Sequence, residues 1–532
     1  NLGYGKRQQS TLEGTLTFQH KFGELLDMNL MAGMGRYLDS GDGSDISYEN
    51  ANDHIQGSSV GMADGPFYPT SYKYKNEKRS QFVRGSFDLF GRYVVSASLR
   101  RDGTDKFFPS KKYALFPSVS LAWKMNEESF IKNISWINML KLRASYGETG
   151  SDNLGTTLYG IVTTTREDVQ FNNNSVTYIP YILSGANYED VTWQKTVMKN
   201  IGLDFSIFRD RIWGSVDVFR NDVTHLLGTA PTELLGMHGT RPINGGHYKR
   251  TGIDVSLNSL NLQTHDFKWT SQITMSHYNA VWIERMPNYD YQKYQKRKNE
   301  PMNAFYYYKT TGIIDMDKSN MPESQRSLGP AACMPGYPIV EDKNGDGIID
   351  VNDSYMDNML PKLYFGFGNT FTWKNFDLDI FMYGQLGVKK WNDAYSYSAD
   401  AGNLSRGVDA HNVGIYSYNI WNTQTNTNGY FPGIAISKSV ALPENLGFDY
   451  TRENASYIRV RNITLGYNLG PKELSVFKGY IRGIRVFVDF QNPLTFTKYK
   501  GYDPEINTSS SNLTGGQYPQ MRVYSIGAKL TF

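Results

Sequence analysis

The sequence predicts an all-β fold, a transmembrane antiparallel β-barrel, from three observations. Apolar and polar residues alternate with a period of two in segments of roughly ten residues, the length that a tilted strand needs to cross a bilayer. The chain contains 38 Tyr, 28 Phe and 9 Trp, and membrane barrels place such aromatic side chains at both interfaces. The connections between the segments alternate between short and long, which is typical of periplasmic turns and extracellular loops.

The last segment, 522–532, shows the alternation most clearly. Its even-numbered residues from Tyr524 to Phe532 are apolar and share one face, because successive strand side chains point to opposite faces. In a soluble sheet this face would form an exposed edge, which proteins usually avoid. In a membrane barrel the same face meets lipid, so the segment favours a barrel.

Fifteen segments of this kind follow one another along the chain. They are 11–21, 27–37, 80–90, 93–101, 113–124, 139–149, 196–208, 211–219, 248–258, 266–277, 363–373, 376–384, 456–467, 483–491 and 522–532. Turn-forming residues separate the paired segments, such as Gly23, Gly91 and the pair Lys374-Asn375. A change of parity near Arg461 predicts a β-bulge, and 125–138 is long enough for one helical turn.

The strand number also predicts how this chain relates to a whole barrel. Bacterial barrels normally have an even number of strands, and fifteen is odd. A transporter barrel of about 22 strands with a plugged lumen would have seven strands more. We therefore expect that an odd number of strands precedes Asn1 in the intact protein. The residues 278–361 are expected to form a long extracellular loop.

Composition excludes several other classes of protein. The 55 Lys and Arg nearly balance the 52 Asp and Glu, so nucleic acid is not an expected partner. A single cysteine, Cys333, excludes an intrachain disulfide framework. Mean hydropathy is −0.50, and no apolar run is long enough for a membrane-spanning helix. The usual catalytic motifs for metal, serine or phosphate chemistry are absent, so we do not expect an enzyme.

Several motifs resemble those of the SusC family of TonB-dependent outer-membrane transporters. They occur in family order along nearly the whole chain: 100–103 (RRDG), 116–123 (FPSVSLAW), 140–147 (LKLRASYG), Trp193 with 200–204 (NIGLD), 501–505 (GYDPE), 518–520 (YPQ) and 530–532 (LTF). The resemblance implies a 22-stranded barrel in a bacterial outer membrane, a SusD-like surface lipoprotein as a lid, energy from TonB, and an oligosaccharide or, less often, a peptide as cargo. It also implies that Phe532 is the signal that the barrel-insertion machinery reads. Nothing in 1–532 resembles the N-terminal plug, the TonB-contacting segment or the early strands of the family. The resemblance therefore implies that residues 1–532 are the C-terminal part of such a barrel, without the N-terminal plug and the first strands.

The loop 342–353 has the residue pattern of a twelve-residue calcium site. Oxygen-bearing side chains stand at its positions 1, 3, 5, 9 and 12, Gly347 stands at position 6, and position 7 offers a backbone carbonyl. The predicted ligands are Asp342, Asn344, Asp346, Ile348, Asp350 and Asp353. Position 12 is Asp rather than Glu, as in dockerin-like loops. A turn rich in Asn and Asp that holds no ion is the alternative, because such residues favour turns by themselves.

Two further groups of residues bear on the cargo. Aromatic residues in the outer loops are candidates to stack on sugar rings, although such residues more often pack within loops: Trp391, Tyr395, Tyr397, Trp421 and Tyr430. Parity places charges of both signs on the lumen face, which favours a neutral cargo: Lys141, Arg143, Asp204, Asp217, Asp254, Asp377, Asp379, Arg485, Asp489 and Lys529.

The sequence thus favours TonB-dependent import of oligosaccharides across the bacterial outer membrane. Peptide import by the same architecture is the nearest alternative. A calcium-stabilised surface adhesin that does not transport, and a soluble glycan-binding β protein, are alternatives of other classes. A need for detergent during extraction would distinguish a barrel from a soluble protein.

Overall fold

The structure is a computed structural model. It describes residues 2–48, 67–153, 163–165, 171–173, 176–178, 181–183, 189–231, 240–287, 295, 299–392, 419–429, 431, 433, 442–471, 473–477, 480–501, 503–506 and 520–532. Its main element is one antiparallel sheet of 15 strands, in which each strand pairs with the next one along the chain. They are β1 (Leu2–Phe22), β2 (Leu26–Tyr48), β3 (Phe67–Leu89), β4 (Tyr93–Thr104), β5 (Tyr113–Lys124), β6 (Ile137–Ser151), β11 (Gln194–Ile207), β12 (Ile212–Pro231), β13 (Thr240–Gln263), β14 (Phe267–Glu284), β19 (Leu363–Trp373), β20 (Phe376–Leu386), β24 (Tyr457–Leu469), β25 (Gly483–Thr497) and β26 (Val523–Thr531).

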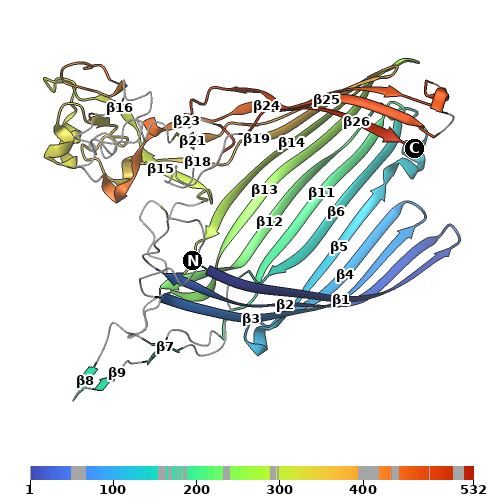
Figure 1. Cartoon of the computed structure of the whole chain (residues 1–532), viewed down its shortest axis with the longest axis horizontal. Coiled ribbons are helices and arrows are strands. Elements are labelled where there is room, and N and C mark those ends of the chain that lie inside the picture. Colours follow the sequence, from blue (N-terminus) through green and yellow to red (C-terminus); the bar gives the residue numbers. More distant parts are fainter. Residues whose placement is uncertain are drawn as a thin grey trace.

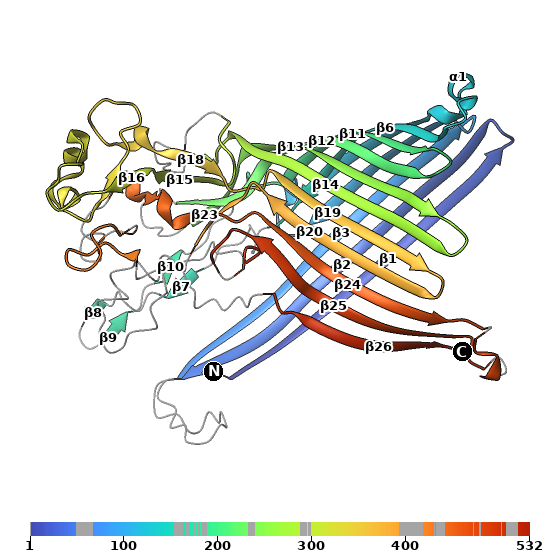
Figure 2. The ribbon, with the colours of Figure 1, turned by 90° about the horizontal axis from the view of Figure 1, so that it is seen from above.

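The sheet curves like the wall of a barrel, and its two ends differ. The long connections gather at one end and the short turns at the other, as both views show (Figures 1 and 2). All fifteen predicted strands are present and in the predicted order. The predicted helical turn between β5 and β6 is also present, as a 3₁₀ turn (Met125–Glu127) and the short helix α1 (Ser129–Lys132). The predicted bulge is present in β24, where the ladder skips Arg461.

Several strands are much longer than the ten residues predicted. The strand β13 has 24 residues, and β2 and β3 have 23 each. Most of 220–247, which separates the predicted segments 211–219 and 248–258, is therefore strand, as are the first residues of 278–361. The extra residues extend the strands toward the long connections. In these extensions the backbone hydrogen bonds between strands continue, for example at the pair Lys6 and Asp42. The extensions have no apolar face, so alternation in the sequence does not reveal them.

The two faces of the sheet differ in character. Directly opposite residues share a face, and Val486 opposite Ala528 belongs to an apolar face, whereas Arg485 opposite Lys529 belongs to a polar one. Side chains of the apolar face are open to the surroundings, and the exposed fractions of Leu16 and Ile526 reach 77% and 79%. An apolar face without a covering layer of protein is what a lipid-facing wall requires.

Most residues of the buried apolar clusters lie in the outer connections, although one cluster includes Phe116 of β5. One cluster contains Tyr308, Val340, Ile349 and Leu442. A neighbouring cluster contains Ile314, Ala332, Tyr337 and Ile339, and both pack against Leu328 and Phe448. We call residues 304–358 with 442–454 the outer module. Among the described residues, no helix is long and apolar enough to cross a membrane.

The outer connections contain short elements of their own. Those between β6 and β11 are β7 (Thr163–Thr165), β8 (Phe171–Asn173), β9 (Val176–Tyr178) and β10 (Tyr181–Leu183). Those of the outer module are β15 (Ala304–Tyr308), β16 (Thr310–Ile313), β17 (Pro338–Val340), β18 (Tyr355–Asn358), β22 (Gly447–Phe448) and β23 (Arg452–Asn454), and β21 (Lys389–Trp391) pairs with β23. The parallel pairing of β15 with β22 joins two connections that are far apart in the sequence.

Candidate functional site

The polar face carries charges that are paired within the wall itself. Arg143 of β6 donates from Nε and Nη2 to Asp204 of β11, at 2.8 and 2.7 Å. Its Nη2 also reaches Oδ2 of Asp217 on β12, at 3.1 Å. Lys141 lies 3.5 Å from the same Asp204 carboxylate. Two cations and two carboxylates from three neighbouring strands therefore compensate one another.

A second group lies on the same face near the end of the chain. Arg485 of β25 donates from Nε to Oδ1 of Asp377 on β20, at 3.2 Å, and Asn468 donates to the same carboxylate. The hydroxyl of Thr370 donates to Asp379 at 2.6 Å. The predicted lumen charges thus share one face, as parity required. Their partners stand on neighbouring strands, so the sequence alone did not reveal the pairing.

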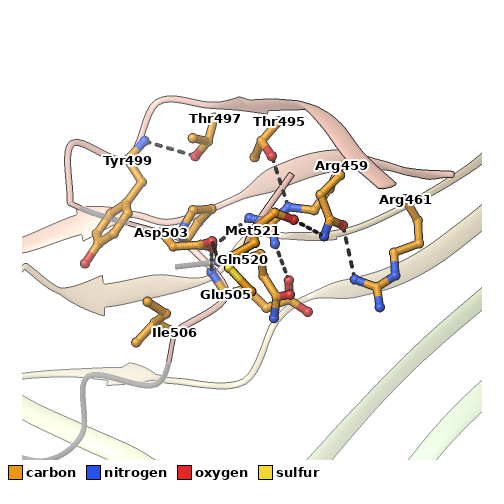
Figure 3. A network of polar contacts seen from close by, with 12 residues as sticks. Arg459, Arg461, Thr495, Thr497, Tyr499, Asp503, Glu505, Ile506, Gln520 and Met521 are labelled. Atoms are coloured by element: carbon orange, nitrogen blue, oxygen red, sulfur yellow. Dashed lines mark hydrogen bonds and ion pairs between the residues drawn. The ribbon is translucent and has the colours of Figure 1, made fainter. Parts of the chain in front are cut away.

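A buried polar network fixes the last outer connection to the wall (Figure 3). At its centre is Arg459 of β24, whose side chain is only 3% exposed. Its Nη2 donates to Oδ1 of Asp503 at 2.7 Å, its Nη1 to Oε2 of Glu505 at 2.6 Å, and its Nε to the hydroxyl of Thr495 at 3.0 Å. Each of the three guanidinium nitrogens therefore has an acceptor, which is the arrangement that a buried cation needs.

Further contacts hold the same connection in place. The hydroxyl of Tyr383 donates to Oε2 of Glu505 at 2.7 Å, and the backbone N–H of Gln520 donates to Oδ2 of Asp503 at 3.1 Å. The ammonium of Lys390 reaches the backbone carbonyl of Ile506 at 3.3 Å, and burial lowers the pKa of this lysine. The sequence marked 501–505 only by resemblance, and its attachment to Arg459 is a finding of the structure.

The loop 342–353 is a tight turn that contains two glycines with positive φ. Gly345 and Gly347 have φ of +73° and +83°, a conformation that glycine adopts without steric cost and that permits the sharp turn. The carboxylate of Asp342 accepts the N–H groups of both glycines, at 2.7 and 2.8 Å. Asp353 accepts the N–H of Lys343 at 2.9 Å and that of Asp350 at 2.8 Å. The predicted first and last ligands therefore close the loop on itself.

Other residues of the outer module hold this loop in place. Ile349 is 3% exposed, and its N–H donates to the hydroxyl of Ser327 at 2.8 Å. The hydroxyl of Tyr308 donates to the backbone carbonyl of Asp350 at 3.0 Å, and burial raises the pKa of this tyrosine. The residues present suit a hard cation, because carboxylate, amide and carbonyl oxygens surround a fixed turn. Among the described residues, however, no three His, Cys, Asp or Glu side chains converge on one point.

The predicted sugar-contacting residues and the insertion signal have different surroundings. Trp421 is 6% exposed, and its ring occupies the space beside Gly336, so it packs inside the loops. Trp391 belongs to β21, but its side chain lies outside the described part, as do Tyr395, Tyr397 and Tyr430. Phe532, directly after β26, is 76% exposed.

Comparisons with known proteins agree with this architecture. A model of the TonB dependent receptor-like β-barrel matches residues 2–492. The TonB-dependent receptor P3 of Formosa agariphila is 27% identical over 569 residues, covering 99% of this chain and 53% of the relative. The TonB-dependent receptor SusC of Bacteroides thetaiotaomicron is 27% identical over 484 residues, covering 87% of this chain and 44% of the relative. This chain thus spans about half the length of the curated relatives that it matches.

A solved structure shares the fold. The structure of the RagAB peptide transporter superposes with a TM-score of 0.78 at 20% identity, covering 100% of this chain and 56% of the RagAB chain. Its 'open-open' state gives the same TM-score at 21% identity, with 55% of that chain covered.

Proposed function

Because the chain belongs to the family of TonB dependent receptor-like β-barrels, we propose that it forms the outer-membrane wall of an oligosaccharide importer. The exposed apolar face supports a position in lipid. In this proposal a SusD-like lipoprotein covers the mouth formed by the long connections, and TonB supplies energy through an N-terminal part of the protein. The barrel-insertion machinery reads Phe532. The proposal assigns no catalytic step to this chain.

One observation supports a neutral cargo most directly, namely the pairing of charges within the polar face. Arg143 is neutralised by Asp204 and Asp217, and Arg485 by Asp377. Ion pairs of this kind attract neither anions nor cations strongly, because opposite charges a few ångströms apart cancel at the distance of a passing solute. A polyhydroxylated neutral solute still finds hydrogen-bonding partners on such a wall.

Peptide import is the second candidate, because RagAB, whose fold this chain shares, is a peptide transporter. At 20% identity this likeness shows the fold alone and does not select the cargo. An adhesin that does not transport is the third candidate. A plug and a TonB-contacting segment encoded upstream of these residues would argue against it.

Deletion of the full-length gene is expected to abolish uptake of neutral oligosaccharides and to leave uptake of peptides unchanged. The measurement is accumulation of fluorescently labelled hexasaccharides and of labelled tryptic peptides in the deletion strain, with the complemented strain as the control. Loss of peptide uptake alone would select the peptide alternative. Unchanged uptake of both, with loss of surface attachment, would select the adhesin.

We also propose that the loop 342–353 binds one calcium ion that stiffens the outer module. Asp342, Asn344, Asp346, Asp350 and Asp353 would supply side-chain oxygens, and Ile348 its backbone carbonyl. The contacts of Asp342 and Asp353 with backbone N–H groups leave further lone pairs on each carboxylate, so the same oxygens remain able to bind the ion. Anchoring of Ile349 in the apolar cluster would connect the ion to the fold of the module.

The variant Asp346→Ala is expected to lose the stabilisation that calcium gives. Binding to the folded state alone raises stability by about 2.7 kcal/mol at a hundredfold excess over Kd. In calcium buffer the variant should therefore unfold at the temperature at which the wild type unfolds in chelator. Differential scanning calorimetry of the full-length protein in detergent measures this. Asp317→Ala, which removes an exposed carboxylate in a turn of the same module, is the matched control. If chelator changes neither protein, the loop is a turn without an ion.

A further inference from the structure

A recess of about 550 Å³ opens on the polar face of the sheet, beside the buried network of Arg459, to which its lining residue Tyr383 also belongs. It spans the neighbouring strands β12, β13, β14, β19 and β20, which run side by side in Figure 2. Asp254, Thr274, Ser276, Tyr364, Phe381 and Tyr383 contribute to its lining. Its volume lies within the range of about 300–1,000 Å³ that is typical of small-molecule sites.

The recess belongs to the lumen side of the wall. Asp254 stands opposite Asp217 and Ser276, and Ser276 stands opposite Tyr364. Because opposite residues in a ladder share a face, these side chains lie on the face that carries Arg143 and its partners. Tyr364 is the second residue of β19, directly after the longest connection, so the recess lies toward the outer end of the wall.

An open aromatic ring forms one side of this recess. Phe381 is 41% exposed although it lies on the polar face, and its ring stacks on that of Tyr383 with centroids 6.5 Å apart and planes 12° apart. Gly366 lies beneath Phe381, and a Cβ there would stand 3.4 Å from the Phe381 ring and 2.8 Å from the hydroxyl oxygen of Thr274. The glycine thus leaves room for the ring to lie close to the wall.

Hydrogen-bonding groups and fixed aromatic rings form the other side. The hydroxyl of Ser276 donates to Oδ1 of Asp254 at 2.6 Å, which leaves the second carboxylate oxygen as an acceptor. Tyr364 stacks on Tyr278 with planes 1° apart, and the Arg250 guanidinium lies 3.8 Å from the Tyr278 centroid. These stacked groups fix the orientation of the Tyr364 ring. Of the described residues that line the recess, only Asp254 carries a charge.

We propose that this recess is a binding subsite for one pyranose ring of a neutral oligosaccharide, an inference that rests on the proposed function. The apolar C–H face of the sugar stacks on Phe381, and its hydroxyl groups donate to Asp254 and exchange hydrogen bonds with Ser276 and Thr274. A flat apolar surface beside a carboxylate acceptor matches the two-sided character of a pyranose ring. A subsite at the outer end would hold cargo between the mouth and the rest of the lumen.

The test measures binding to the full-length transporter in complex with its lipoprotein, in detergent, by isothermal titration calorimetry. The probes are maltohexaose, cellohexaose, mannohexaose and xylohexaose as neutral glycans, hexagalacturonate as an anionic glycan, and a tryptic peptide mixture. Phe381→Ala is expected to weaken binding of the neutral glycan that the wild type prefers by about tenfold, the loss of one aromatic contact. Phe381→Tyr should restore affinity to within about twofold of the wild type, because it keeps the ring.

Two further variants separate a subsite from a general loss of structure. Gly366→Ala should weaken glycan binding, because the added methyl group occupies the space between the Phe381 ring and the Thr274 hydroxyl. Phe367→Ala removes a ring of the same size from the opposite face of β19 and should leave affinity unchanged.

If the Phe381→Ala variant binds the glycan with the affinity of the wild type, the proposed subsite is wrong, and the proposal of oligosaccharide import is unaffected. If the wild type binds only the peptides or only the anionic glycan, both the subsite and the proposed neutral cargo are overturned.

Discussion

Replacement of Arg459 by alanine is expected to release the last outer connection from the wall. The guanidinium is buried and satisfies two carboxylates, those of Asp503 and Glu505, at 2.7 and 2.6 Å. Removal of the cation leaves Asp503, which is itself almost fully buried, without its charge partner. Breaking a buried pair in this way costs about 3–5 kcal/mol, because the remaining charge is neither solvated nor compensated. That cost is large enough to favour opening of the connection.

Limited proteolysis of the full-length protein in detergent measures this opening as faster cleavage between residues 498 and 522. The matched control is Arg461→Ala, which removes an exposed arginine only two residues away. Arg461 donates a hydrogen bond from Nη1 to Oδ1 of Asn492 at 3.1 Å and pairs with no carboxylate in that contact. A triple variant, Arg459→Ala with Asp503→Asn and Glu505→Gln, should recover part of the protection, since it removes the uncompensated charges as well. Equal cleavage of Arg459→Ala and the wild type would show that the network does not hold the connection.

The second large effect is expected at the lipid-facing side of the last strand. The variant Ile526→Arg places a cation on the apolar face of β26, at a side chain that is 79% exposed. An arginine in the hydrocarbon region of a membrane barrel costs about 2–4 kcal/mol near the midplane. The neighbouring residue Ser525 points to the polar face, opposite Asp489, so Ser525→Arg should be tolerated.

The measurement is urea unfolding of the full-length protein in lipid vesicles, followed by the difference in gel mobility between folded and unfolded barrels. The expected order of stability is wild type, then Ser525→Arg, then Ile526→Arg well below both. If the two arginine variants lose the same stability, or Ser525→Arg loses more, the assignment of the apolar face to lipid is wrong.

The barrel wall was predictable because one physical constraint acts on every strand. A residue that faces hydrocarbon must be apolar and its neighbours need not be, so the period of two persists from Leu12 to Leu530. This constraint ends where the strand leaves the bilayer. The outer parts of β2, β3, β12 and β13 are held by ladder bonds and by polar pairs such as Arg36 with Glu77, without an apolar face, and the strands predicted from alternation were therefore too short.

The outer module was not predictable, because its contacts join distant segments without a repeating pattern. Tyr308, Val340 and Leu442 meet in one cluster although more than a hundred residues separate the first from the last. The recess around Phe381 was missed for a related reason, since Asp254, Tyr364 and Phe381 come from three different strands. A signal was present: Phe381 is an aromatic residue at a position where parity expects a polar one. Calcium at 342–353 remains a prediction.

The bulge at Arg461 gives β24 one residue more than its neighbour β20 has across from it. The ladder passes from Asn462 opposite Phe381 to Val460 opposite Met382, and Arg461 is the additional residue. If the same residues formed a regular strand, Arg459 would turn toward the acyl chains and Val460 toward the lumen. Loss of position 461 would instead make the ladder with β20 regular and leave both orientations unchanged. Evolution can therefore shorten β24 at this point without reversing its sidedness, whereas a deletion within a strand without a bulge would reverse everything beyond it.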